Sequence, residues 1–315
     1  MSFSIFSMIE KPFGNLPRLC VGLLAVASLL FSAGVNAQGV KPAAKPETTA
    51  KAEKWVLKLE KMNVQDFVNP TVIDNKWIPM KPGTRWTYEG TTVEDDGKVV
   101  PHKIVINITD MVKEIGGVLN VVTYDLDYKD GELEEAELAF FAQDKHGTVW
   151  FFGEYPEEYD GKKIVKTPAW LHGIEGASAG IRMKANPNVG GPSYSQGYGP
   201  AVKWTDRGQA IKAGEKVTVR AGKYDNVLVV RESSKEEGED AYQLKYYAQG
   251  VGNIKVGWGG AKEKTQETLE LVKVEQMSAA ELADVRKKAL AMEKSAYQQS
   301  KNVYGKTKPM QPRKD

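Results

Sequence analysis

Hydrophobic and polar residues alternate along much of the chain, in short segments that are separated by turn residues. In the segment 103–109, Ile104, Ile106 and Ile108 alternate with Lys103 and Asn107. A period of two places every second side chain on the same face, which is typical of a β-strand with one buried face. A Gly supplies the positive φ that tight hairpins need. Such glycines stand at Asp96-Gly97, Asp130-Gly131, His146-Gly147 and Asp160-Gly161.

The same pattern continues through the chain and predicts a series of β-strands. The expected strands are 85–89, 103–109, 118–128, 133–143, 148–152, 162–166, 216–220, 227–232, 243–248, 253–256 and 267–274. No long helical pattern lies between them. The fold class that follows is mainly β, with an antiparallel meander forming a β-sandwich or a (half-)barrel.

Residues 140–154 (FFAQDKHGTVWFFGE) stand out, because residues 246–256 (YYAQGVGNIKV) repeat their plan. Both stretches open with two aromatic residues and Ala-Gln, turn through a Gly and continue with β-prone residues. This order predicts two β-hairpins of one domain. We therefore interpret the motif first as a signature of the fold.

Residues 170–209 interrupt the regular strands with a loop that is rich in Gly and Pro. Trp170 and Trp204 bracket this loop, and Tyr194 and Tyr198 lie within it. A loop of this length in a compact domain often carries a function. Large aromatic side chains also close hydrophobic cores, so a covering loop that caps one end of the core is the alternative.

The region after residue 274 has a different pattern, which predicts a C-terminal α-helix. Ser278 and Glu281 have the spacing of a capping box. Apolar residues then recur at helical spacing, at Leu282, Val285, Ala289, Met292 and Ala296. We expect the helix to run from Ala279 to Tyr304, and to pack weakly because its apolar stripe has few large side chains. Residues 306–315 are expected to have no fixed structure.

The N-terminal residues have the layout of a secretory signal peptide. Lys11 and Arg18 precede an apolar run at 19–33, and small residues lead up to Ala37. The run is shorter than the about 20 apolar residues that a membrane span needs, so cleavage after Ala37 is expected. The expected organisation is a signal peptide (1–37), a flexible linker (38–53), a β-rich domain (54–274) and a helical and basic tail (275–315).

Export sets the expected location and the redox chemistry. The mature protein is expected to be periplasmic or secreted, with no membrane span after signal cleavage. Cys20 is the single cysteine and lies in the signal, so the mature protein would have no disulfide and no thiol chemistry. A net charge of +2 gives no long-range attraction to nucleic acid, and we expect no nucleic-acid partner.

Few groups have the spacing of a catalytic or metal site. His102, His146 and His172 are far apart and fit no metal-ligand pattern, so we expect them to be exposed. Asp125 and Asp127 superficially resemble a calcium loop, but the residues that follow are out of register with one. No nucleotide-binding loop and no Gly-x-Ser-x-Gly elbow occurs. We therefore expect no metal and no cofactor, and catalysis is not the favoured interpretation.

Two carboxylates at the aromatic hairpin keep a glycan-directed hydrolase as an alternative. Asp144 opens the turn, Glu154 ends the hairpin, and Trp150 between them could stack on a sugar. Such a pair could act as acid and base if the two carboxyl groups face each other. An Asp at this place also has a common structural role, because Asp often opens turns.

A ligand site is expected where the long loop meets the aromatic hairpin, because the mouth of a barrel is a common binding site. The candidate ligand-binding residues are Asp144, Trp150, Glu154, Trp170, Tyr194, Tyr198 and Trp204. The expected partner is an amphipathic small molecule or a component of the cell envelope. A structural accessory partner of another exported protein is a further alternative.

Residues 69–274 resemble a family of uncharacterised exported bacterial β-rich proteins. The resemblance rests on IPMKPGTRWTYEG (78–90), AQDKHGTVWFFGE (142–154), GIRM (180–183) with Pro187, and YYAQGVG (246–252). The last stretch is also similar to the closing hairpin of half-barrel envelope proteins, among them lipoprotein carriers, although Ala248-Gln249 stands where a Pro is frequent there. The resemblance implies an exported β-domain and carries over no site residues.

Overall fold

The structure is a computed structural model that describes residues 56–238 and 240–314. The predicted signal peptide (1–37) and the predicted flexible linker (38–53) lie outside the described residues. The strands are β1 (Thr84–Val93), β2 (Val99–Ile115), β3 (Val118–Lys129), β4 (Glu132–Gln143), β5 (Val149–Asp160), β6 (Lys163–Lys166), β7 (Trp170–Leu171), β8 (Gly180–Met183), β9 (Tyr194–Ser195), β10 (Arg207–Val219), β11 (Gly222–Ser233), β12 (Tyr242–Ala248), β13 (Gly252–Gly259), β14 (Thr268–Gln276) and β15 (Gln311–Pro312). The helices are α1 (Ala279–Gln299) and the short 3-10 helices η1 (Val64–Asp66), η2 (Pro200–Val202) and η3 (Tyr304–Lys306).

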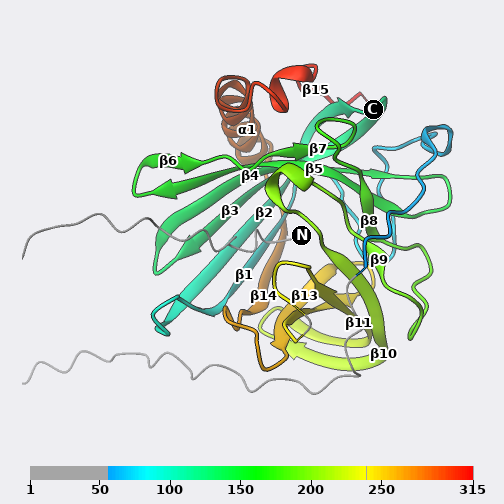
Figure 1. The fold of residues 1–315 in the computed structure, drawn as a ribbon, viewed down its shortest axis with the longest axis vertical. Helices are drawn as coiled ribbons and strands as arrows, with labels where there is room; N and C mark the ends of the chain where they lie inside the picture. The colour runs from blue at the N-terminus through cyan, green and yellow to red at the C-terminus, as the bar shows by residue number, and fades with distance from the viewer. Residues whose placement is uncertain (1–55, 239, 315) are drawn as a thin grey trace, which may run out of the picture.

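Within the described residues, the strands form one 15-stranded antiparallel sheet that curves around an interior (Figure 1). Consecutive strands pair from β1 to β6 and from β9 to β14, and the pairing of β1 with β14 joins the two series. The sheet is open, with β6 and β9 at the ends of its strand order. The predicted class, mainly β with a C-terminal α-helix, is confirmed, and the open curved sheet replaces a closed barrel.

Strands β4 and β5 are buried on both faces, which explains the doubled aromatic residues of the 140–154 motif. Phe141 and Phe151 belong to a hydrophobic cluster inside the curve of the sheet, which we call the inner cluster. Phe140 and Phe152 belong to a second cluster on the other face, which we call the outer cluster. Because adjacent side chains of a strand point to opposite faces, each aromatic pair supplies one ring to each cluster.

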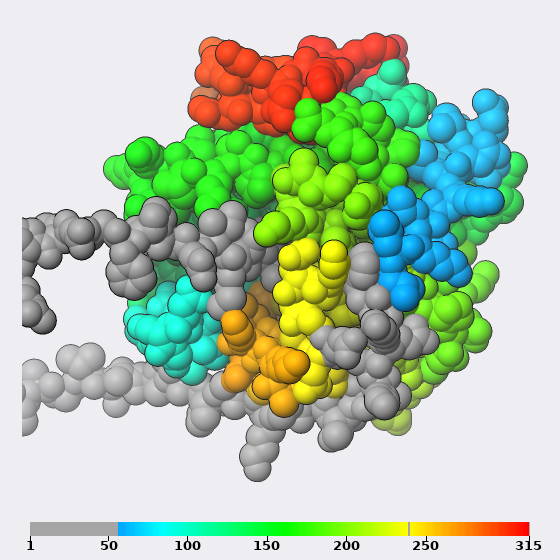
Figure 2. Space-filling view, viewed as in Figure 1, coloured from blue at the N-terminus to red at the C-terminus, as the bar shows by residue number. Residues whose placement is uncertain are grey.

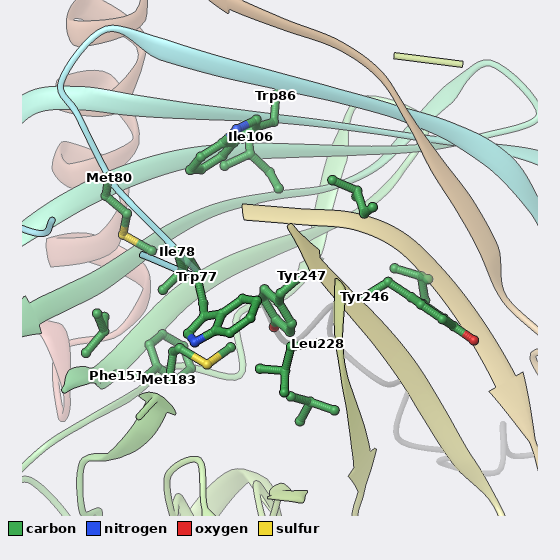
Figure 3. Packing of buried hydrophobic residues seen from close by; sticks show 14 of the residues in the cluster. Trp77, Ile78, Met80, Trp86, Ile106, Phe151, Met183, Leu228, Tyr246 and Tyr247 are labelled. Carbon is green, nitrogen blue, oxygen red and sulfur yellow. The ribbon is translucent and has the colours of Figure 1, made fainter. Parts of the chain in front are cut away.

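The inner cluster joins the two halves of the sheet and the segment that precedes β1. Figure 3 shows Trp77 beside Met183 and Tyr247, with Leu228 close to them. Trp86 of β1 lies on the same cluster and is 2% exposed. These residues come from β1, β8, β11 and β12 and from the segment before β1, which are far apart in the sequence, so the cluster can form only when the whole sheet is assembled.

One end of the long loop connects the two sides of the sheet. Strand β8 pairs with β5, and β9 pairs with β10. Ser178, which precedes β8, and Tyr198, which follows β9, form an isolated antiparallel bridge. Their backbone amides donate to each other's carbonyls at 2.8 and 2.9 Å. Gly180 permits this approach, because a Cβ there would lie 2.0 Å from the backbone N of Gly197.

Helix α1 covers the outer cluster. The helix begins at Ala279 and is capped by Ser278, whose side chain accepts from the amide of Glu281 while the Glu281 side chain accepts from the amide of Ser278. Figure 2 shows the C-terminal residues spread over strands in the first half of the sheet. Ala289, Met292 and Ala296 are buried in this contact. In the described part of the chain, the apolar length that a membrane-spanning helix requires is not found in any helix.

A buried ion pair fixes α1 to the sheet. The ammonium of Lys113 in β2 is 2.9 Å from the carboxylate of Glu293 in α1, and their side chains are 0% and 6% exposed. Lys113 also donates to the carbonyl of Lys308 at 2.6 Å and lies 4.1 Å from the ring centroid of Tyr304. Glu293 accepts in addition from the amide of Met310. One pair therefore holds both the helix and the chain that follows it.

The C-terminal residues differ from the expectation in two ways. The helix ends at Gln299 rather than near Tyr304. Residues 306–314 have a defined course, in which β15 pairs with β2 and Met310 is buried. The physical reason is the buried charge of Lys113, since its neutralisation requires Glu293 and the Lys308 carbonyl to be held in place.

Removing the acidic partner of the buried pair should be costly. Glu293→Ala leaves the Lys113 ammonium buried without its counter-charge, so we expect the free energy of unfolding to fall by about 3–5 kcal/mol. The double variant Lys113→Met, Glu293→Leu should recover most of this loss. Lys288→Ala is the control, because the Lys288–Asp284 pair is exposed and should change stability by less than about 0.5 kcal/mol. Urea unfolding measures all three, and equal losses for Glu293→Ala and Lys288→Ala would contradict the prediction.

A methyl group at Gly180 should separate the two sides of the sheet. Its nearest neighbours would be backbone atoms of Gln196 and Gly197, which cannot move away like a flexible side chain. We expect Gly180→Ala to lower stability by at least about 1–3 kcal/mol and to expose the 184–203 loop to limited proteolysis. Gly305→Ala is the matched control, because its Cβ would meet its first neighbour only at 3.8 Å. Unchanged stability and proteolysis of Gly180→Ala would show that the contact is not needed.

Candidate functional site

The inner face of strands β3 to β5 changes from apolar to acidic along its length. Alternation places Glu137 on the same face of β4 as Phe141 of the inner cluster. Asp125 of β3 lies directly opposite Glu137 in the strand register. On β5, the bulge at Gly153 follows Phe151 and returns the next residue, Glu154, to this face. The carboxyl groups of Asp125, Glu137 and Glu154 thus gather at one end of the interior.

Glu137 and Glu154 form a buried pair of carboxyl groups. Their residues are 7% and 3% exposed. Burial raises the pKa of Glu137 well above its ordinary value, and the charges of Glu154 and Asp125 raise it further. Burial likewise raises the pKa of Glu154, with added repulsion from Glu135 and Asp206. Two adjacent carboxyl groups cannot both ionise without a large electrostatic cost, so burial and repulsion both favour the protonated form of this pair.

Two carboxyl oxygens of this group have no hydrogen-bond partner among the described residues. They are Oδ1 of Asp125 and Oε2 of Glu154. The other oxygen of Asp125 accepts from the hydroxyl of Thr123 at 3.2 Å. Burial raises the pKa of Asp125 to about 8, although this hydrogen bond acts in the opposite direction. A buried acceptor without a donor is costly, and so these two atoms call for an explanation.

His102 of β2 lies between two further carboxylates. Its Nε2 is 2.6 Å from Asp127, and its Nδ1 is 3.1 Å from Glu267. Burial lowers the pKa of His102, but the two carboxylates outweigh this effect and raise it to about 10. His102 is therefore a buried cation, contrary to the expectation of an exposed residue. The signal was present in the sequence, because the alternation of Ile104, Ile106 and Ile108 extends by two residues to His102.

A second network ties the long loop to the opposite wall. The guanidinium of Arg182 in β8 donates to Glu232 and to the hydroxyl of Tyr247, each at 3.0 Å. Gln196 donates to the same oxygen of Glu232 at 2.8 Å. Arg182 and Glu232 are buried. This network pairs the buried guanidinium of Arg182 with Glu232 and links the GIRM stretch (180–183) to β11 and β12.

Two of the predicted site residues have roles inside the aromatic hairpin. One carboxylate oxygen of Asp144 accepts from the amides of His146 and Thr148, at 2.9 and 3.0 Å. The other accepts from the indole of Trp150 at 2.9 Å. Trp150 packs in the outer cluster. Asp144 is thus engaged in the turn, while Glu154 faces Glu137 on the inner side.

The aromatic residues of the long loop are divided among three places. Trp170 and Trp204 pack in the inner cluster, with ring centroids 5.6 Å apart, and both contact Phe151. Tyr194 belongs to the outer cluster. Tyr198 is half-buried at the bridge to Ser178. The structure therefore brings Glu154, Trp170 and Trp204 to the interior, and Trp170 lies opposite Glu154 in the strand register.

The partners of Glu154 were missed from the sequence. Asp125 and Asp127 in β3, and Glu135 and Glu137 in β4, are spaced two apart, which is the spacing of one face of a strand. Only the register of β3 with β4 brings the two pairs together. Across the described part of the chain, no group of three or more His, Cys, Asp and Glu side chains is placed to hold a metal ion.

Comparison with known proteins yields weak likenesses of fold. No protein-family model matches the chain, and no curated protein matches its sequence. A predicted exported protein with a YmcC-like fold from Bacteroides fragilis is 14% identical, with a TM-score of 0.38 over 64% of this chain and 99% of the other. A predicted lipoprotein from Parabacteroides distasonis is 13% identical, with a TM-score of 0.35 over 64% and 100%. At this level of similarity, neither structure indicates what the chain binds or does.

The buried carboxyl groups should make stability depend on pH. The pKa of Asp125 is 3.8 ordinarily and about 8 in the folded protein, so the folded state binds this proton more tightly than the unfolded state. The free energy of unfolding should therefore fall as the pH rises from 5 to 8. Glu267, whose pKa is lowered, stays ionised over this range. The raised pKa of His102 acts in the same direction as Asp125, since its stabilisation is lost as the pH rises toward about 10.

Asp125→Asn tests this directly. It removes the titration of Asp125, so the variant should lose less stability between pH 5 and 8 than the natural protein, by more than about 1 kcal/mol. Asp130→Asn, in an exposed turn, should keep the natural slope. Urea unfolding at the two pH values measures both, and a natural protein whose stability rises from pH 5 to 8 would overturn the prediction.

Proposed function

We propose that this protein is an exported, non-catalytic β-domain that binds an amphipathic small molecule or cell-envelope component on the inner face of its curved sheet. The observation that carries the proposal is that this face has two chemically different ends. Aromatic and aliphatic side chains line one end, and buried carboxyl groups with unpartnered oxygens line the other. Ligand sites are typically apolar with a few convergent polar groups, and an amphipathic molecule matches both ends.

The signal-peptide pattern supports export and a place in the periplasm or outside the cell. Lys11, Arg18, the apolar run and Ala37 have the order of such a signal. A ligand of the cell envelope fits this location. Tyr198 of the long loop is half-buried, and we propose that the ligand reaches the interior past this loop.

The alternative of a glycan-directed hydrolase loses support from the geometry. Its proposed acid and base were Asp144 and Glu154, but Asp144 already accepts three hydrogen bonds within the hairpin. Asp144 binds Trp150 of the outer cluster, whereas Glu154 lies with Glu137 on the inner side, so the two carboxyl groups do not face each other as an acid and a base would. The Glu137–Glu154 pair is therefore better suited to holding a polar group than to turning over a substrate.

The test is native mass spectrometry of protein purified from its own cell envelope. We expect a mass above that of the polypeptide, which organic extraction releases as one class of amphipathic molecule. The same protein, unfolded, extracted and refolded, is the control and should regain the mass only when the extract is returned. A polypeptide mass alone, together with no thermal shift on adding the extract, would contradict ligand binding and favour a structural accessory role.

A further inference from the structure

We infer that the polar end of this ligand is a primary ammonium group, held by Glu154, Glu137 and Asp125 beside the indole ring of Trp170. This inference rests on the proposed function, because it names the chemistry of the same interior site. Nothing in the fold requires these groups to be acidic. Burial alone opposes the ionisation of these carboxyl groups. Three acidic residues at one buried place therefore suggest a bound partner that interacts with carboxylates.

The first argument is a shortage of donors, because Trp170 and Glu137 act on Glu154 as hydrogen-bond partners and yet two carboxyl oxygens of the group remain unpartnered. Oε2 of Glu154 and Oδ1 of Asp125 are buried and have no hydrogen-bond partner among the described residues. Glu154 is 3% exposed, so bulk water does not satisfy it. A primary ammonium carries three N–H donors. It could therefore serve both unpartnered oxygens and one oxygen of Glu137 at the same time.

The second argument is the use of the interior cations. Arg182 is bound to Glu232, His102 is bound to Asp127 and Glu267, and the buried Lys245 is attracted to Glu232 and Glu267. The charges that act most strongly on Glu154 come from Glu135 and Asp206, and both are acidic. A positively charged group bound at this end would favour the ionised form of these carboxyl groups, which burial and mutual repulsion disfavour in its absence.

The third argument is the aromatic surface next to the carboxyl pair. Trp170 lies opposite Glu154 in the register of β7 with β5. The rings of Trp204 and Phe151 lie 5.6 and 5.2 Å from that of Trp170. A cation near an indole face gains further attraction, and the neighbouring apolar rings suit the first carbons of an alkyl chain. Aromatic rings beside the carboxyl groups can contact the carbons of an organic ammonium, whereas a metal ion would need further oxygen, nitrogen or sulfur ligands in their place.

The experiment compares three probes that share a dodecyl chain, each below its micelle concentration, by isothermal titration calorimetry with the extracted, refolded protein at pH 7. Dodecylammonium has N–H donors and charge, dodecyltrimethylammonium has charge alone, and dodecyl maltoside has neither. We expect dodecylammonium to bind at least about tenfold more tightly than the other two, the gain of charge-assisted hydrogen bonds.

Variants of the carboxyl groups test whether they are responsible for the tighter binding of dodecylammonium. Glu154→Gln and Asp125→Asn should each weaken dodecylammonium binding by about tenfold or more and leave dodecyl maltoside binding unchanged. Both are close in shape to the natural residue, and their thermal unfolding confirms that they fold. Glu132→Gln, exposed at the start of β4, is the control and should bind like the natural protein.

The outcomes separate the two proposals. Equal affinity for all three probes, or Glu154→Gln without effect on dodecylammonium, would overturn the ammonium inference and leave ligand binding intact, with water on the unpartnered oxygens. Tighter binding of dodecyltrimethylammonium than of dodecylammonium would also overturn it, because N–H donors would then be unnecessary. Binding of none of the probes, with no ligand in the native mass spectrum, would contradict the proposed function itself.

Discussion

The fold depends on the requirement that the central strands be covered on both faces. Strands β4 and β5 carry large apolar side chains at successive positions, so neither face can be left in water. The curve of the sheet covers one face, and α1 with the C-terminal residues covers the other. Both covers are fixed by buried ion pairs, Arg182–Glu232 inside and Lys113–Glu293 outside. Each pair costs desolvation, and in return it sets a single position for the segment it holds.

The interior combines two kinds of buried charge. Around His102 and Arg182, opposite charges are matched, and each group keeps its charge because a partner lies within hydrogen-bond reach. Around Glu137 and Glu154, two carboxyl groups lie together, and burial and mutual repulsion raise the pKa of both. The first arrangement stabilises the folded state, whereas the second lowers its stability at neutral pH. Proteins often keep such strain at sites that bind or react.

The sequence was sufficient for most of the long strands and for the start of the C-terminal helix, because alternation and the capping box are local signals. The short strands β7, β8 and β9 lie in the expected loop 170–209 and were not predicted. The aromatic doublets also identified the hairpin of β4 and β5. The partners of Glu154 depended on the register of β3 with β4, which no local pattern determines. The defined course of residues 306–314 depended on a contact with Lys113, which lies in another part of the chain. For Asp144, the sequence located the residue in the turn but could not decide its role, since an Asp side chain suits both turn formation and catalysis.

The contact of the C-terminal residues with β2 also bears on how the protein is made. Strand β2 is synthesised early, but its outer face is covered by α1 and its edge contact with β15 involves Gln311 and Pro312. The pairing of β1 with β14 spans a similar distance along the chain. Contacts between such distant segments form slowly, so the domain cannot complete its core while its last residues are still being added. This late completion of the core is compatible with the export that we propose for the chain.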